Sequence, residues 1–138
     1  MMVKRVLYFK LKEGEDLLKT VEKVLEENEV DFCIIKGIGG LSKGKLGVFI
    51  PSEKRYKEVE IEGSEGIVEV ASLLGNSIKG EDGRPHPHLH AVLSNGEKVV
   101  AGHVLEGCRI KPFIELFVLE IENGDKVRSL FEHRWKTS

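Results

Sequence analysis

The chain has 138 residues, enough for one domain that buries a hydrophobic core without disulfide staples. Its residues are 41% hydrophobic and 32% charged, as in an ordinary globular protein, and its formal net charge of −2 provides no global positive field for nucleic acid. No apolar run approaches the length of a membrane helix, and residues 1–5 lead into a strand pattern rather than the apolar core of a signal peptide. We therefore expect a cytoplasmic protein that does not enter a membrane.

The rarer residue types give two further indications. Glutamine is absent and asparagine is scarce, a composition that leans toward a heat-adapted source. The two cysteines, Cys33 and Cys108, form no CxxC pair and lie in apolar segments with strand character. We expect both to be buried, reduced thiols.

The first part of the chain predicts a strand followed by an amphipathic helix. Residues 3–12 alternate between polar and apolar side chains, which favours a half-buried strand. Asp16 is a candidate N-cap for a helix that runs from Leu17 to about Asn28. In that segment the apolar residues recur with a period of 3.6, so one face should pack on the core: Leu17, Leu18, Val21, Val24 and Leu25.

The rest of the chain predicts mainly strands. The glycine pair Gly39-Gly40 should end the first of these, because glycine permits a positive φ at a strand end. A polar loop is expected over 76–87. No repeat, low-complexity tract or linker divides the chain, so the prediction is one α+β domain over residues 1–138. The predicted strands cover 32–38, 45–50, 56–61, 67–74, 88–94, 98–105, 113–121 and 126–135.

The most informative segment is a predicted hairpin that carries three histidines. Asn95-Gly96 between two strand-like runs is a strong signal for a two-residue turn, because both central residues of a type I′ turn need a positive φ. With that turn at the centre, His88 faces His103 across the two strands. His90 lies two residues from His88 and therefore on the same face. Three imidazoles should then converge.

Three imidazole nitrogens suit one divalent ion, and zinc is the ion we expect. The alternative is three unrelated histidines, each hydrogen-bonded within a partly buried sheet. His86 and Glu115 are candidates for a further ligand or an acid–base group; Glu115 lies in an apolar strand, where an unpaired charge is costly, unless it faces outward. His133 is distant in sequence, and a structural or exposed position is expected for it.

These same residues resemble the PPC domain family (plants and prokaryotes conserved), and the resemblance covers nearly the whole chain. Ala101 departs from the glycine that the family has more often. The segments that carry the resemblance are Gly37–Gly47, Leu73-Leu74-Gly75, His88-Leu89-His90-Ala91, Gly102-His103-Val104-Leu105 and the strand that contains Glu115.

The resemblance implies an α+β fold with a large, mostly antiparallel sheet packed with one main helix. It also implies a homotrimer, and a metal site that maps onto His88, His90 and His103. The fold is similar to that of acetolactate decarboxylase, a zinc enzyme, but a similar fold does not transfer an activity. Plant members bind DNA through AT-hooks; here Asp82 replaces the first arginine of a hook-like Gly83-Arg84-Pro85.

Three functions are compatible with this sequence. The first is a metal-binding, self-associating module within a DNA-associated regulatory complex. The second is a zinc-dependent enzyme that acts on a small molecule through the histidine-bound metal. The third is a DNA-binding protein, which the net charge and the dispersed lysines argue against. Self-association is also expected from the strands themselves, because several carry apolar residues on both faces and one helix cannot cover both.

Overall fold

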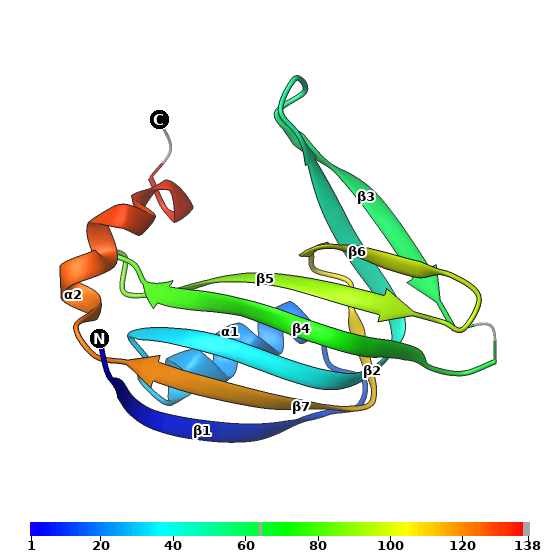
Figure 1. The fold of residues 1–138 in the computed structure, drawn as a ribbon, viewed down its shortest axis with the longest axis horizontal. Coiled ribbons are helices and arrows are strands. Elements are labelled where there is room, and N and C mark those ends of the chain that lie inside the picture. The colour runs from blue at the N-terminus through cyan, green and yellow to red at the C-terminus, as the bar shows by residue number, and fades with distance from the viewer. Residues whose placement is uncertain (64, 137–138) are drawn as a thin grey trace.

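Seven strands form one antiparallel sheet, and helix α1 lies against one of its faces (Figure 1). The structure is a computed structural model that describes residues 1–63 and 65–136. The elements are β1 (Val3–Lys12), α1 (Leu17–Glu27), β2 (Phe32–Ile50), β3 (Arg55–Glu62), β4 (Val68–Lys79), β5 (Pro85–Ser94), β6 (Val99–Val104), β7 (Arg109–Ile121), α2 (Gly124–Val127) and a 3₁₀ helix, η1 (Arg128–Arg134).

The α+β class, the first strand and the helix are confirmed, whereas three predicted boundaries are wrong. β2 runs without a break where two strands were predicted. Most of the predicted loop 76–87 belongs to β4 and β5. The predicted last strand, 126–135, is helical. Among the described residues, no helix has the length and apolar character needed to span a bilayer.

β2 is the strand around which the sheet is organised. The order is β1-β7-β2-β4-β5-β6, and β3 pairs with the second half of β2. β6 also returns to that second half, where Gly47 lies opposite His103. As a result β2, β4, β5 and β6 form a closed ring of paired strands. The edge of β6 that carries His103 is paired with β2.

The glycine pair Gly39-Gly40 does not end β2, contrary to the prediction. It forms a bulge within the continuous strand. The register with β4 and β7 shifts around Gly39, whose φ is +149°. A Cβ on Gly39 would lie 2.3 Å from the carbonyl oxygen of Phe113. The glycine therefore allows two backbones to approach closely within a continuous strand.

Helix α1 and one face of the sheet enclose the core. Asp16 caps the helix by accepting a hydrogen bond from the backbone N–H of Lys19 at 3.0 Å, as predicted. Leu17, Val21 and Leu25 are buried in the core cluster. Both cysteines are also buried and unpaired, as expected.

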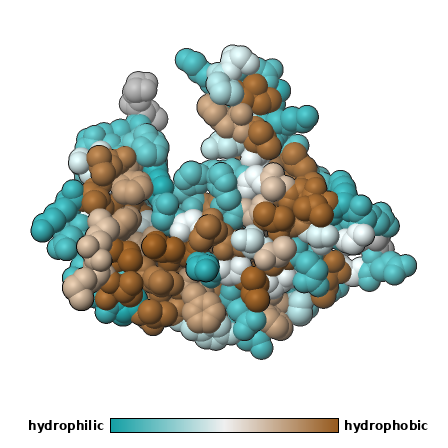
Figure 2. Space-filling view, viewed as in Figure 1, coloured by the Kyte–Doolittle hydropathy of each residue, from teal (hydrophilic) through white to brown (hydrophobic). Residues whose placement is uncertain are grey.

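The opposite face of the sheet, called the outer face below, exposes a set of apolar side chains. It is the face toward the viewer in Figure 1, and Figure 2 shows hydrophobic residues gathered over β1, β7 and β2 in the lower left. Rings of Tyr8 and Phe117 pack on each other there at 5.1 Å. The exposed apolar residues of the outer face are Val6, Tyr8, Ile34, Ile38, Leu74, Val92 and Phe117.

The C-terminal helices pack against one end of β2, β4 and β5. Phe131 packs on Phe32 with a ring separation of 5.8 Å. Arg128 donates from Nε to the carbonyl oxygen of Lys79 at 2.9 Å and forms an ion pair with Asp31. These contacts fix residues 124–134 beside the start of β5, close to the histidines.

Candidate metal centre

The hairpin that carries the histidines has a longer loop than predicted. Ser94 lies opposite Val99, so four residues, Asn95–Lys98, connect β5 to β6, and the predicted two-residue turn is wrong. His90, rather than His88, therefore lies opposite His103. The shift moves the pairing by two residues, and a shift by an even number leaves every side chain on its original face. The three histidines consequently remain on one face.

Asn95 explains why the loop is longer. Its Oδ1 accepts hydrogen bonds from the backbone N–H groups of Glu97 and Lys98 at 2.9 and 3.0 Å, and its Nδ2 donates to the carbonyl oxygen of Glu62 at 3.0 Å. Only Gly96, with φ +90°, has a left-handed backbone in this loop. The asparagine thus acts through its side chain rather than through a positive φ.

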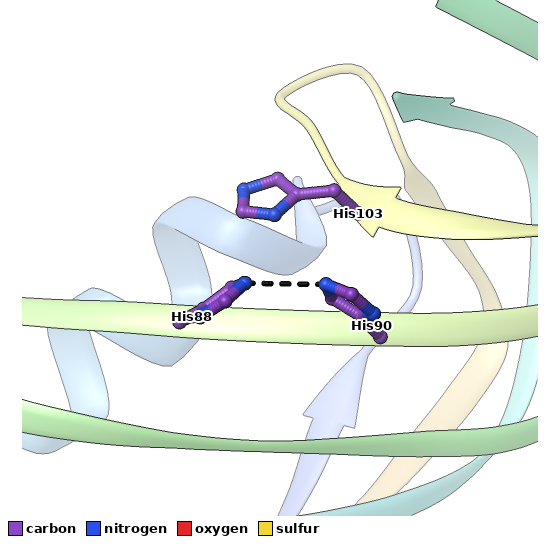
Figure 3. A group of neighbouring side chains, drawn as sticks. All are labelled: His88, His90 and His103. Atoms are coloured by element: carbon purple, nitrogen blue, oxygen red, sulfur yellow. Dashed lines mark hydrogen bonds between the residues drawn. The ribbon is translucent and has the colours of Figure 1, made fainter. Parts of the chain in front are cut away.

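The three imidazoles converge in the space between β5 and β6 (Figure 3). The Nε2 atoms of His88 and His90 are 3.2 Å apart. The ring of His103 lies 4.8 Å from that of His88 and 5.6 Å from that of His90, centroid to centroid. One nitrogen from each ring can be chosen so that all three lie within 4.8 Å of one another.

Two glycines allow the strands to bring these rings together. A Cβ on Gly75 of β4 would lie 1.9 Å from the carbonyl oxygen of His88, and one on Gly102 would lie 2.7 Å from the carbonyl oxygen of Gly47. Any larger residue would push β4 or β2 away from the histidine strands. The glycines in the Leu74-Gly75 and Gly102-His103 segments are therefore required by close backbone packing.

The environment of the cluster favours the neutral form of two of its histidines, His88 and His103. Burial, together with His88 and His90, lowers the pKa of His103 to about 4. Burial and the nearby Arg134 guanidinium lower the pKa of His88. Neutral imidazole is the form that binds a metal ion, so the lowered pKa values of His88 and His103 favour metal binding near neutral pH.

The residues fit a zinc ion. Zinc accepts three histidine nitrogens at about 2.0–2.1 Å in a tetrahedral arrangement, which places pairs of nitrogens about 3.3 Å apart. The separation of 3.2 Å between His88 and His90 is close to that value. A nitrogen of His103 lies within 4.8 Å of the other two ligand atoms. Three protein ligands leave a fourth position open.

A pocket of about 380 Å³ opens beside the cluster. Its walls come from helix α1, β3, β5, β6 and the C-terminal helix, which are far apart in the sequence. Its volume lies in the range of small-molecule sites. The lining residues are Glu22, Tyr56, Pro85, His86, Pro87, His88, His103, His133 and Arg134.

The structure does not bring the two additional candidate ligands into the cluster. The Nε2 atom of His86 lies 2.8 and 3.0 Å from the two carboxylate oxygens of Asp82. The Glu115 carboxylate accepts a hydrogen bond from the hydroxyl of Tyr8 at 3.2 Å, and Glu115 lies on β7, separated from β5 by β2 and β4. Within the described residues, only His88, His90 and His103 form a group with metal-ligand spacing.

Sequence reasoning missed two residues at this site. Tyr56 of β3 lies against His103 with a ring separation of 4.8 Å. Arg134 enters the pocket from the C-terminal helix, which was predicted to be a strand. Helical spacing between Val127 and Phe131 was the available signal for that helix.

The lowered pKa of His103 predicts a pH dependence of stability in chelator-treated protein. The unfolded chain binds a proton on this residue below about pH 6.5, whereas the folded chain does so only near pH 4. The free energy of unfolding should therefore fall as the pH drops through this window. Urea unfolding at pH 7 and pH 5 measures the fall, which should be smaller in His103→Asn. Equal falls in wild type and His103→Asn would contradict the assignment.

Comparison with known proteins places this chain and its fold in a family. A PPC protein from Pyrococcus horikoshii is 32% identical to the chain, with a TM-score of 0.78 over 88% of this chain and 82% of that protein. A metal-containing protein from Archaeoglobus fulgidus is 27% identical, with a TM-score of 0.76 over 86% and 81%. A protein from Ralstonia eutropha, provisionally described as DNA-binding, shares the fold at 21% identity, with a TM-score of 0.74 over 84% and 78%. A search of curated proteins gave no match.

The family model agrees with the structural comparison. The model of the Plants and Prokaryotes Conserved domain matches residues 1–122, which include every strand, helix α1 and all three clustered histidines. It ends before α2 and η1. The resemblance inferred from the histidine and glycine segments is confirmed: the chain belongs to the Plants and Prokaryotes Conserved domain family, abbreviated PCC or PPC.

Proposed function

We propose that this protein is a metal-binding, self-associating module that holds one zinc ion through His88, His90 and His103. The observation that carries the proposal is the convergence of three imidazole nitrogens, all within 4.8 Å of one another, from two adjacent strands. The lowered pKa values of His88 and His103 add to it, because cationic histidines would repel a metal ion. The name of the Archaeoglobus relative, a metal-containing protein, agrees with this function.

The pocket supports a second candidate, a zinc-dependent enzyme that acts on a small molecule. A bound zinc ion with an open position supplies Lewis acidity and lowers the pKa of a bound water. The chain itself would contribute a pocket of about 380 Å³ next to that position. Tyr56 and Arg134 would orient a ligand there, and the pocket walls would limit its size.

Self-association is proposed to occur through the outer face. The cross-strand row Tyr8, Phe117, Lys36, Leu74 and His90 runs across this face to the metal site. A second copy of the chain offers an apolar surface of the same kind, and covering both would remove apolar area from water at about 25 cal/mol per Å². Closed cyclic assemblies are the usual result of such contacts. A trimer is the assembly that the family resemblance favours.

Any role in a DNA-associated complex would depend on partner proteins rather than on a basic surface. The net charge is −2, and Lys43 and Lys45 are engaged with Glu60 and Glu58 of the neighbouring strand at 3.8 and 3.4 Å. Tight DNA binding draws its free energy from the release of counterions by clustered cations. Direct binding by the isolated protein should therefore be weak and sensitive to salt.

Metal analysis tests the proposed site. Protein purified without chelator and supplied with micromolar zinc should retain one zinc ion per chain after gel filtration. Removal of that zinc by a strong chelator should lower the melting temperature, because a ligand that binds only the folded state stabilises it. Protein that retains no zinc under these conditions would refute the proposal.

A further inference from the structure

We propose that the pocket beside the histidine cluster binds a small organic monocarboxylate, with one carboxylate oxygen at the open metal position and Arg134 donating hydrogen bonds to the anion. This inference rests on the metal site proposed above and names the ligand class for it. It assigns a role to the C-terminal helix, which lies outside the matched family domain of residues 1–122.

The C-terminal helix η1 supplies one wall of the pocket, and the sheet supplies others. β5, β6 and β3 supply His88, His103 and Tyr56, whereas η1 supplies His133 and Arg134. Without the helix, the metal position would face open solvent on this side. With it, the site becomes a pocket of about 380 Å³ with a fixed cation in its wall.

Arg134 is held in place by neutral groups. Its Nη1 donates to the carbonyl oxygen of His86 at 3.0 Å, and its Nη2 donates to Oδ1 of Asn76 at 2.6 Å. Its guanidinium carbon lies 4.6 Å from the centroid of the Phe131 ring. The orientation of the guanidinium is therefore fixed by β4, β5 and its own helix.

The positive charge of Arg134 is not neutralised by the residues that the structure describes. None of the ion pairs among them includes Arg134, and its buried Nε has no hydrogen-bond partner there. Partial burial of the guanidinium also lowers its pKa. The Nε atom is closed to solvent, but Nη1 and Nη2 each carry a second N–H beyond the one that is bonded. These donors of a partly buried guanidinium suit an anion, and carboxylates match their planar geometry.

The charges and walls of the pocket suit an anion with an organic body. A zinc ion and Arg134 would contribute positive charge, while Glu22 is the one carboxylate in the lining, and burial raises its pKa. A single carboxylate group is enough to meet both the metal position and the guanidinium. Pro85, Pro87 and Tyr56 provide apolar surface for a small carbon skeleton.

Calorimetry with zinc-loaded protein tests the inference, with pyruvate as the carboxylate probe and methyl pyruvate as its neutral counterpart. Wild type should bind pyruvate at least ten times more tightly than methyl pyruvate. Arg134→Gln should weaken pyruvate binding at least tenfold while the zinc content stays at one ion per chain. Cobalt-substituted protein should change its visible spectrum on addition of pyruvate, because the anion enters the coordination shell.

A matched control distinguishes the effect of the Arg134 guanidinium from a general effect of positive charge. Lys136 lies on the same segment but is exposed and pairs with Glu81 and Glu132, so Lys136→Gln should bind pyruvate like wild type. Trp135, the one tryptophan of the chain, packs 5.3 Å from His86, and its fluorescence reports whether the helix stays docked in each variant. If Arg134→Gln undocks the helix, Arg134→Lys provides the test instead. This variant keeps the positive charge but loses the paired N–H donors of the guanidinium, so it should bind pyruvate more weakly than wild type does.

The outcomes for the metal site and for the anion are distinct. Protein that holds one zinc ion per chain but binds pyruvate no better than methyl pyruvate would refute the anion pocket and leave the metal site standing. Unchanged pyruvate affinity in a docked Arg134 variant would refute the role of Arg134. Protein that binds no zinc would refute the metal site and the anion pocket together.

Discussion

Replacement of His103 by alanine is expected to lower zinc affinity at least about 100-fold. The variant would leave two ligands where three converge, and loss of even a residue that only supports a ligand typically costs 10–100-fold in metal affinity. His88→Ala and His90→Ala should have effects of the same size, because all three nitrogens lie within 4.8 Å of one another. Competition with a chromophoric zinc chelator at pH 7.5 measures each affinity.

His86→Ala provides the matched control for this series. His86 lies on the same strand two residues from His88, but its Nε2 atom is engaged by the Asp82 carboxylate at 2.8 Å. Its replacement should change zinc affinity by less than about threefold. A His86→Ala variant that loses zinc as fully as His103→Ala would show that the ligand set is wrong. Retention of full affinity by His103→Ala would show the same.

The grouping of the histidines could be predicted because it depends only on whether the residues are an even or an odd number of positions apart. Residues an even number apart on a strand share a face. The sequence indicates two neighbouring antiparallel strands, and His88 and His90 must share a face on one of them. The pairing with His103 was predicted two residues out of register, yet an even shift conserves the face. The actual loop depends on the side-chain bonds of Asn95, including one to Glu62 of β3, a contact that no local pattern contains.

The missed features depend on contacts between distant segments. β2 continues through Gly39, where the backbone of β7 approaches it closely. In the sequence alone, a glycine at this position is equally compatible with the end of a strand. Tyr56 reaches the cluster because the second half of β2 pairs with both β3 and β6, and the Tyr56 side chain lies over Gly47 between them. The alternation within 56–61 does not reveal this arrangement. Arg134 reaches it through the packing of Phe131 on Phe32. Each of these depends on tertiary packing rather than on local propensity.

Ile34→Lys is expected to convert the protein from an oligomer to a monomer. Ile34 lies on β2 in the middle of the outer face, between Leu119 of β7 and Asn76 of β4, and its side chain is 40% exposed in the single chain. A lysine there can remain hydrated in a monomer, but it would be buried against an apolar partner surface in an assembly. Each subunit would carry the change, so the cost would multiply across the interfaces.

Light scattering coupled to size exclusion measures the assembly at micromolar concentration. Wild type should give three times the chain mass of 15.5 kDa, and Ile34→Lys should give the mass of one chain. Leu130→Lys is the control, because Leu130 is 72% exposed on η1, away from the outer face, and its replacement should leave the trimer intact. A wild-type monomer would contradict self-association through the uncovered sheet. A stable dimer that Ile34→Lys dissociates would keep the outer face as the interface and refute the trimer alone.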